Sequence, residues 1–195
     1  MSKSLALSLQ AYQVTGTLTA AMAPLALVDN SAIGGGPPVT ILGFTMQRQV
    51  QSQWCWAATS TSVSLFYNAG SSWTQCLVAQ QVTGNTCCIN PMPCNHTSTL
   101  SLALRITGNL LMQAGRLTFQ QVEAELTSDR VVGARIGWFG GGGHSMVIYG
   151  CEVINGVNYY YIDDPIYGKS QISENGFNTA YQGTGSWTHS YTTTP

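Results

Sequence analysis

Residues 49–60 read Gln-Val-Gln-Ser-Gln-Trp-Cys-Trp-Ala-Ala-Thr-Ser and place Cys55 between two tryptophans. Apolar residues follow at helical spacing as far as Tyr67, and Gly70 is a typical stop signal, so a helix is predicted from Cys55 to about Asn68. A thiol at a helix N-terminus lies beside unpaired backbone N–H groups, which favour the thiolate. The stretch indicates either a reactive cysteine or a structural cysteine buried between core aromatics.

Gln49 precedes Cys55 by six residues. This spacing would allow the side-chain amide of Gln49 to lie beside the sulfur and donate a hydrogen bond to an oxyanion. Three further glutamines surround this position and are the alternative donors: Gln47, Gln51 and Gln53.

A second stretch supplies an imidazole and a carboxylate. His144 follows four glycines and opens an apolar run typical of a buried strand. Asn155-Gly156 is a two-residue hairpin signal, and the predicted return strand ends at Asp163-Asp164. An antiparallel pair would bring Asp164 back beside His144, with Asp163 as the alternative, and such a carboxylate orients an imidazole. Cys55, His144 and Asp164 therefore form a candidate nucleophile, base and orienting acid.

The motif Gln-x5-Cys-Trp-Ala-Ala at residues 49–58, the glycine-preceded His144 and the strand end at Asp164-Pro165 resemble the papain-like cysteine peptidase superfamily. Within it, the chain is similar to compact bacterial members with this motif, including secreted effector proteases and double-glycine leader peptidases. The resemblance covers about residues 44–192. Papain differs in reading Cys-Gly-Ser-Cys-Trp around its nucleophile and in having Asn as its third residue, so the resemblance is to the superfamily rather than to papain itself.

The resemblance implies an α+β, papain-like fold of two lobes. The N-terminal lobe would be helical and carry the Cys55 helix, and the C-terminal lobe would be an antiparallel β-sheet carrying His144. It also implies a cysteine endopeptidase that hydrolyses peptide or protein substrates through a thioester acyl-enzyme, without a cofactor or metal. Asp164 would orient His144, and Gln49 with the Cys55 N–H would form the oxyanion hole. Two alternatives stay open: a transamidase or peptide ligase using the same triad, and a non-enzymatic, disulfide-stapled binding module.

Composition limits the possible partners. Of the 195 residues, 44% are hydrophobic and 8% are charged, which suits one compact domain with extensions. The net charge of −1 gives no electrostatic basis for binding nucleic acid or an anionic membrane. No apolar run approaches the ~20 residues that span a bilayer. We expect a monomer that is secreted or exported.

Residues 1–38 form a separate N-terminal extension, because the Gly- and Pro-rich run at 34–38 is typical of a linker. The peptidase domain would then occupy residues 39–195. The extension is either an arm packed on the domain or a propeptide that blocks the cleft and makes the protein a zymogen. Polar residues interrupt the apolar stretch that follows Lys3, so no signal peptide is predicted.

The chain has six cysteines, and four of them cluster in a short stretch: Cys76, Cys87, Cys88 and Cys94. They predict two disulfides in one of three connectivities, and hence an oxidising environment. The alternative is a zinc site made by the last three and His96, although adjacent cysteines differ from the usual Cys-x2-Cys spacing. Cys151 would be a buried strand thiol.

Helices are expected at about 55–68, 74–82, 99–106 and 118–126, and strands at 39–47, 131–138, 145–151, 159–162, 170–172 and 186–192. Thr74 is a candidate N-cap, and Thr118 with Gln121 fits a capping box. Trp187 is a candidate wall for the His144 region, and His189 is expected on a strand face. Helices first and strands last agree with an α+β fold.

Overall fold

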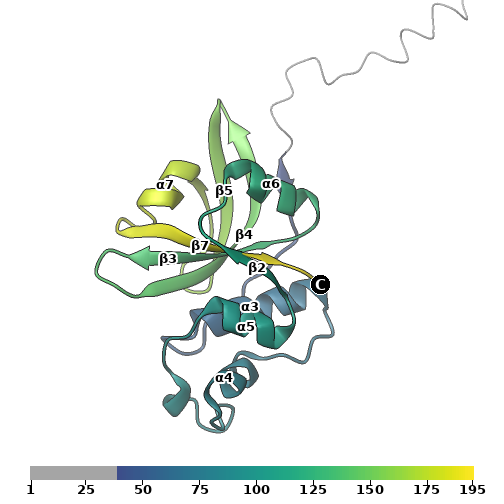
Figure 1. Cartoon of the computed structure of the whole chain (residues 1–195), viewed down its shortest axis with the longest axis vertical. Coiled ribbons are helices and arrows are strands. Elements are labelled where there is room, and N and C mark those ends of the chain that lie inside the picture. The colour runs from purple at the N-terminus through teal and green to yellow at the C-terminus, as the bar shows by residue number, and fades with distance from the viewer. Residues whose placement is uncertain (1–38) are drawn as a thin grey trace, which may run out of the picture. The chain divides into compact units, whose positions relative to one another are not determined.

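The computed structural model describes residues 39–195, which form a helical lobe and a sheet lobe (Figure 1). The predicted N-terminal extension, whether arm or propeptide, lies outside the described residues. The helical lobe contains α3 (Cys55–Tyr67), α4 (Gln75–Thr83), the 3-10 helix η2 (Met92–Cys94) and α5 (Leu100–Thr107). The sheet lobe contains β1 (Thr40–Ile41), β2 (Leu110–Ala114), α6 (Phe119–Thr127), β3 (Val132–Trp138), β4 (Gly143–Ile154), β5 (Val157–Asp164), β6 (Gly168–Ser173), α7 (Glu174–Thr179) and β7 (Gly185–Thr193). This arrangement confirms the α+β, papain-like prediction.

The antiparallel sheet has the strand order β2-β7-β3-β4-β5-β6, and β1 pairs with β4. Successive side chains of a strand point to opposite faces, so the apolar strands feed two cores. One core lies under α6 and α7 and includes Ile136 and Met146. The other includes Val147 and Tyr191 and packs against Val63 of α3 and Leu104 of α5. The sheet is therefore covered on both faces, with the helical lobe against one of them (Figure 1).

The N-terminus of α3 is anchored by its two tryptophans, both fully buried. The indole N–H of Trp54 donates to the carbonyl of Cys94 at 2.8 Å, and that of Trp56 donates to the carbonyl of His96 at 3.2 Å. Buried indole nitrogens need such partners. The cysteine-rich loop thus fixes the position of the first turn of α3, where Cys55 lies.

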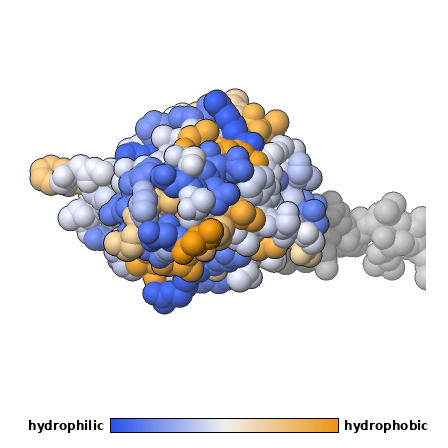
Figure 2. Space-filling model, turned by 90° about the horizontal axis from the view of Figure 1, so that it is seen from below, coloured by the Kyte–Doolittle hydropathy of each residue, from blue (hydrophilic) through white to orange (hydrophobic). Residues whose placement is uncertain are grey.

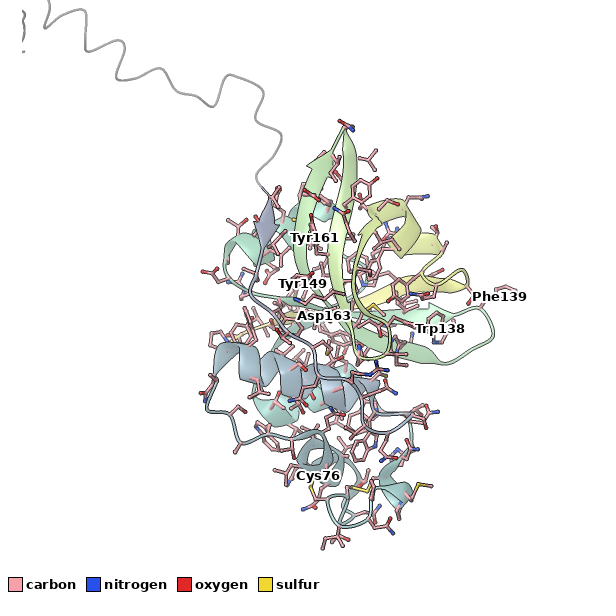
Figure 3. The ribbon with its side chains drawn as sticks, turned by 180° about the vertical axis from the view of Figure 1, so that it is seen from behind. Cys76, Trp138, Phe139, Tyr149, Tyr161 and Asp163 are labelled. Atoms are coloured by element: carbon pink, nitrogen blue, oxygen red, sulfur yellow. A yellow bond between two sulfur atoms is a disulfide. The ribbon has the colours of Figure 1, made fainter. Side chains whose placement is uncertain are left out.

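The cysteine cluster forms two disulfides, Cys76–Cys88 and Cys87–Cys94, as predicted (Figure 3). The neighbouring residues Cys87 and Cys88 bond to different partners. All three cysteines of the alternative zinc site are in disulfides, so they have no thiolate to bind zinc. Cys151 is a buried free thiol, and burial raises its pKa to about 12, which makes it unreactive. Figure 2 shows the helical end of the molecule, where hydrophobic patches lie among hydrophilic side chains.

The predicted helices and the capping box of Thr118 and Gln121 are confirmed, but the strand predicted at 39–47 is wrong beyond β1. The rest of that segment is held by side chains of the sheet instead: Asp163 accepts from the N–H of Met46 at 2.9 Å, and Lys169 donates to the carbonyl of Phe44 at 2.7 Å. Within residues 39–195, no helix is both long and apolar enough to cross a membrane.

Three elements were not predicted: β2, α7 and the 3-10 helix η2. β2 reads Leu-Leu-Met-Gln-Ala, which lacks the alternation of a half-buried strand, and Leu111 and Met112 are exposed. It is a strand because it pairs with β7. The short α7 begins at the N-cap Ser173, whose hydroxyl accepts from the N–H of Gly176. Tertiary pairing, rather than local pattern, determines β2.

Candidate active site

The site lies where the start of α3 meets the start of β4 and the end of β5. Cys55 is the first residue of α3, His144 the second of β4 and Asp164 the last of β5. The Cys55 thiol lies close enough to the His144 ring for each group to shift the pKa of the other. His144 Nε2 lies 2.9 Å from both carboxylate oxygens of Asp164. Because Nε2 is hydrogen-bonded to Asp164, Nδ1 is the ring nitrogen that is available to exchange a proton with the thiol.

A register shift in the β4–β5 hairpin determines which of the two aspartates, Asp163 or Asp164, lies beside His144. The pairing is shifted by one residue around Tyr149, and beyond it Val147 lies opposite Asp163. Directly opposed residues share a face of the sheet, and faces alternate along a strand. Asp164 therefore lies on the same face as His144. Without the shift, Asp163 would lie on that face.

Asp164 is held by four hydrogen-bond donors. Besides the His144 ring, it accepts from the hydroxyl of Tyr181 at 2.7 Å and from the N–H groups of Ile166 at 2.7 Å and Tyr167 at 2.9 Å. Burial raises the pKa of this carboxyl, but its hydrogen bonds and the nearby imidazolium outweigh burial and lower the pKa. Asp164 is therefore a buried carboxylate with a fixed orientation.

Asp163 has different partners. It accepts from the Met46 N–H and lies 3.7 Å from the Lys169 ammonium group, and burial raises its pKa against both of them. In Figure 3, Asp163 lies near the boundary of the sheet and helical lobes. Asp163 thus binds the segment around Met46, which leads to the loop before Cys55, to the sheet, while Asp164 contacts His144.

The protonation states of Cys55 and His144 are coupled. Burial raises the pKa of Cys55, but its hydrogen bond to His144, the charge of that ring and bonds from Ser145 lower it overall. Burial lowers the pKa of His144, whereas its bonds to Asp164 and Cys55 raise it to about 9. The opposed shifts of the two pKa values favour the thiolate–imidazolium pair over the neutral pair. Ser145 was not predicted, although it adjoins His144 in the sequence.

Two aromatic rings enclose His144. Trp138 is stacked on it, with ring centroids 6.1 Å apart and planes at 24°, and Tyr167 meets it edge-on at 6.2 Å. Trp187, the tryptophan suggested by the sequence, instead packs on Tyr160 in the core beneath α7. Aromatic cover reduces the access of water to the imidazolium and strengthens its ion pair.

Gln49 organises the loop before Cys55. Its Nε2 donates to the carbonyls of Gln51 at 2.9 Å and Ser52 at 2.8 Å, and its Oε1 is buried without a partner among the described residues. The N–H of Cys55, at the first position of a helix, lacks an intrahelical acceptor. The structure thus places a carboxamide and a helix N-terminus on the loop that carries the thiol.

Gln75, the first residue of α4, is a further support that the sequence did not reveal. Its Oε1 accepts from the N–H of Val50 at 3.0 Å, and its Nε2 donates to the carbonyl of Arg48 at 2.8 Å and to Gln47 Oε1 at 3.1 Å. Gln75 is buried, and it binds the backbone of the residues immediately before and after Gln49. Gln47, one of the alternative oxyanion donors, has its Oε1 bound to Gln75 and therefore supports the loop that precedes Cys55.

The fold and this cysteine–histidine–aspartate arrangement resemble those of the papain-like cysteine protease superfamily. The family model described as papain-like cysteine protease AvrRpt2 matches residues 40–182, and the chain belongs to this family. A solved structure from work on antibody cross-reactivity between the mite allergens Blo t 1 and Der p 1 has a TM-score of 0.51 and 12% identity, covering 86% of this chain and 74% of that one. This likeness shows the fold alone. A search of curated proteins gave no match.

Proposed function

We propose that this protein is a cysteine endopeptidase whose nucleophile is Cys55. The observation that carries the proposal is the placement of Cys55, at the N-terminus of α3, beside His144, whose ring is hydrogen-bonded to Asp164. The opposed pKa shifts of the thiol and the imidazole support it, because an activated thiolate needs a nearby cation.

In the proposed reaction, the Cys55 thiolate attacks the scissile carbonyl carbon and the carbonyl oxygen becomes an oxyanion. His144 then transfers its Nδ1 proton to the leaving amine, the C–N bond breaks, and a thioester forms. Water attacks the thioester while His144 accepts a proton from that water; the C–S bond then breaks, which restores the Cys55 thiolate and releases the acid product. Asp164 keeps the ring oriented throughout.

The proposed oxyanion donors are the Cys55 N–H and the side-chain amide of Gln49. For Gln49 to donate, one of its two N–H groups turns from the carbonyls of Gln51 and Ser52 toward the oxyanion. The support of Gln75 on the flanking residues keeps the loop in place during this turn.

Cleavage of a peptide library, read by mass spectrometry, tests the proposal. The wild type should cleave, and Cys55→Ala should show no cleavage while keeping its thermal unfolding temperature. Cys151→Ala is the matched control because it removes the other free thiol, and it should cleave normally. Cleavage by Cys55→Ala would refute the proposal. Products extended by an added amine would instead indicate a transamidase or ligase.

The two disulfides indicate an oxidising environment. We therefore propose that the protein acts outside the cytosol as a secreted or exported protease. Recovery of the protein from culture medium with both disulfides formed would support this location.

A further inference from the structure

A cavity of about 350 Å³ is lined in part by Cys55, and its volume is large enough to admit a side chain of a bound peptide. Its walls come from the start of α3, the residues leading into α5, and strands β3, β4 and β7. Trp56, Leu100 and Tyr191 supply apolar surface, and Ser98 and Thr99 supply polar groups. Any group in this cavity lies close to the nucleophile.

Arg135 of β3 is the one side chain in the cavity wall with a permanent charge. It is paired in register with Ser145 of β4, which also lines the cavity, so both lie on the same face. None of the lining residues is Asp or Glu, and within residues 39–195 no carboxylate forms an ion pair with Arg135. The positive charge of Arg135 is therefore not paired with a carboxylate in the described part of the chain.

The guanidinium group is fixed by neutral acceptors. Its Nη1 donates to the hydroxyl of Thr188 at 3.0 Å, and its Nη2 donates to the carbonyl of Gly142 at 3.1 Å. A guanidinium has five N–H donors, so these two bonds leave donors available. Arg135 is therefore held in one orientation without having its charge neutralised.

Gly143 makes this placement possible. A Cβ at Gly143 would lie 2.5 Å from Nη2 and 2.6 Å from the central carbon of the guanidinium. The guanidinium thus packs directly against the backbone just before His144. A group positioned in this way loses little conformational entropy when it binds a ligand.

We propose that this cavity is a subsite for an acidic side chain of the substrate, with Arg135 as its specificity-determining residue; this inference rests on the proposed peptidase function. A carboxylate would accept charge-assisted hydrogen bonds from the free guanidinium donors. A lysine or arginine would meet a like charge there and be excluded.

The experiment uses a proteome-derived peptide library and the full chain. Wild-type cleavage sites should show Asp or Glu enriched at one position relative to the scissile bond. A synthetic peptide made from the best site should then be cleaved about tenfold faster with Glu than with Gln at that position, which corresponds to about 1.4 kcal/mol. Arg135→Gln should abolish this ratio, and Arg135→Lys should reduce it. Arg116→Gln is the matched control, because Arg116 is exposed, lies outside the cavity wall and carries the same charge.

The outcomes separate the two claims. No cleavage of any peptide by the wild type would refute the peptidase proposal, and the subsite inference would fall with it. Cleavage without an acidic preference, or with a preference that survives in Arg135→Gln, would overturn the subsite inference alone. If Arg135→Gln does not fold, the Glu-to-Gln ratio of the wild type still decides, because a charge-based preference must shrink as the salt concentration rises.

Discussion

Replacing Asp164 by Asn tests how the carboxylate supports the thiolate. The change preserves side-chain volume and leaves one oxygen to accept from Ile166 and Tyr167, but it removes the charge beside His144. The pKa of His144 is raised from 6.5 to about 9, and the hydrogen bond that its ring donates to Asp164 is the largest contribution that raises it.

The expected magnitude follows from that shift. One pKa unit corresponds to about 1.4 kcal/mol, so the net upward shift represents about 3 kcal/mol, which is what remains of the contributions of Asp164 and Cys55 after the opposing effect of burial. We expect Asp164→Asn to lower the pKa of His144 by about one unit. The thiolate then loses stabilisation by the imidazolium, and the alkylation rate of Cys55 at neutral pH should fall about tenfold.

The assay is the second-order rate of alkylation by iodoacetamide as a function of pH, with Asp163→Asn as the matched control. Asp163 is adjacent and similarly buried, but it contacts Met46 and Lys169 instead of His144. Asp163→Asn should keep the alkylation rate within about threefold of the wild type. An equal or larger loss in Asp163→Asn would refute the assignment of Asp164 as the orienting acid.

Three further predictions concern the same site. Gln49→Ala should lower kcat on the order of 100-fold without unfolding the protein, and an unchanged kcat would exclude Gln49 as an oxyanion donor. The pH profile of kcat/KM should be bell-shaped. It should fall above about pH 9, because His144 loses its proton, and it should fall in acid, because the Cys55 thiolate is protonated at its lowered pKa. Activity that keeps rising above pH 10 would contradict the ion pair. Replacing both Cys87 and Cys94 by Ser should reduce the free energy of unfolding by about 2 kcal/mol in urea titrations and lower activity as well, because this loop fixes the start of α3; full activity would contradict that role.

The sequence was sufficient to predict the fold class, the helix that begins at Cys55 and the hairpin that brings His144 and Asp164 together. Those features depend on local signals: helical spacing after Cys55 and a two-residue turn before the return strand. The choice between Asp163 and Asp164 depends on the register shift around Tyr149, which no local pattern marks. A single-residue shift reverses the faces of all later residues.

Other parts of the site depend on contacts between distant segments. Tyr181, which follows α7, donates a hydrogen bond to Asp164, and Gln75 of α4 accepts one from Val50 in the loop that precedes Cys55. Arg135 gives no sequence signal, because it interrupts an apolar strand in the way that any surface residue does. Its place in the cavity results from the packing of β3 against Gly143.

The most direct measurement is the covalent reaction of the intact protein with the epoxide inhibitor E-64 near neutral pH, followed by peptide mapping. A single adduct should form on Cys55, disappear in Cys55→Ala, and form far more slowly in His144→Ala. Cys151 should stay unmodified, because burial raises the pKa of its thiol to about 12. No adduct, or an adduct on Cys55 that forms as fast in His144→Ala, would contradict an activated thiolate paired with His144.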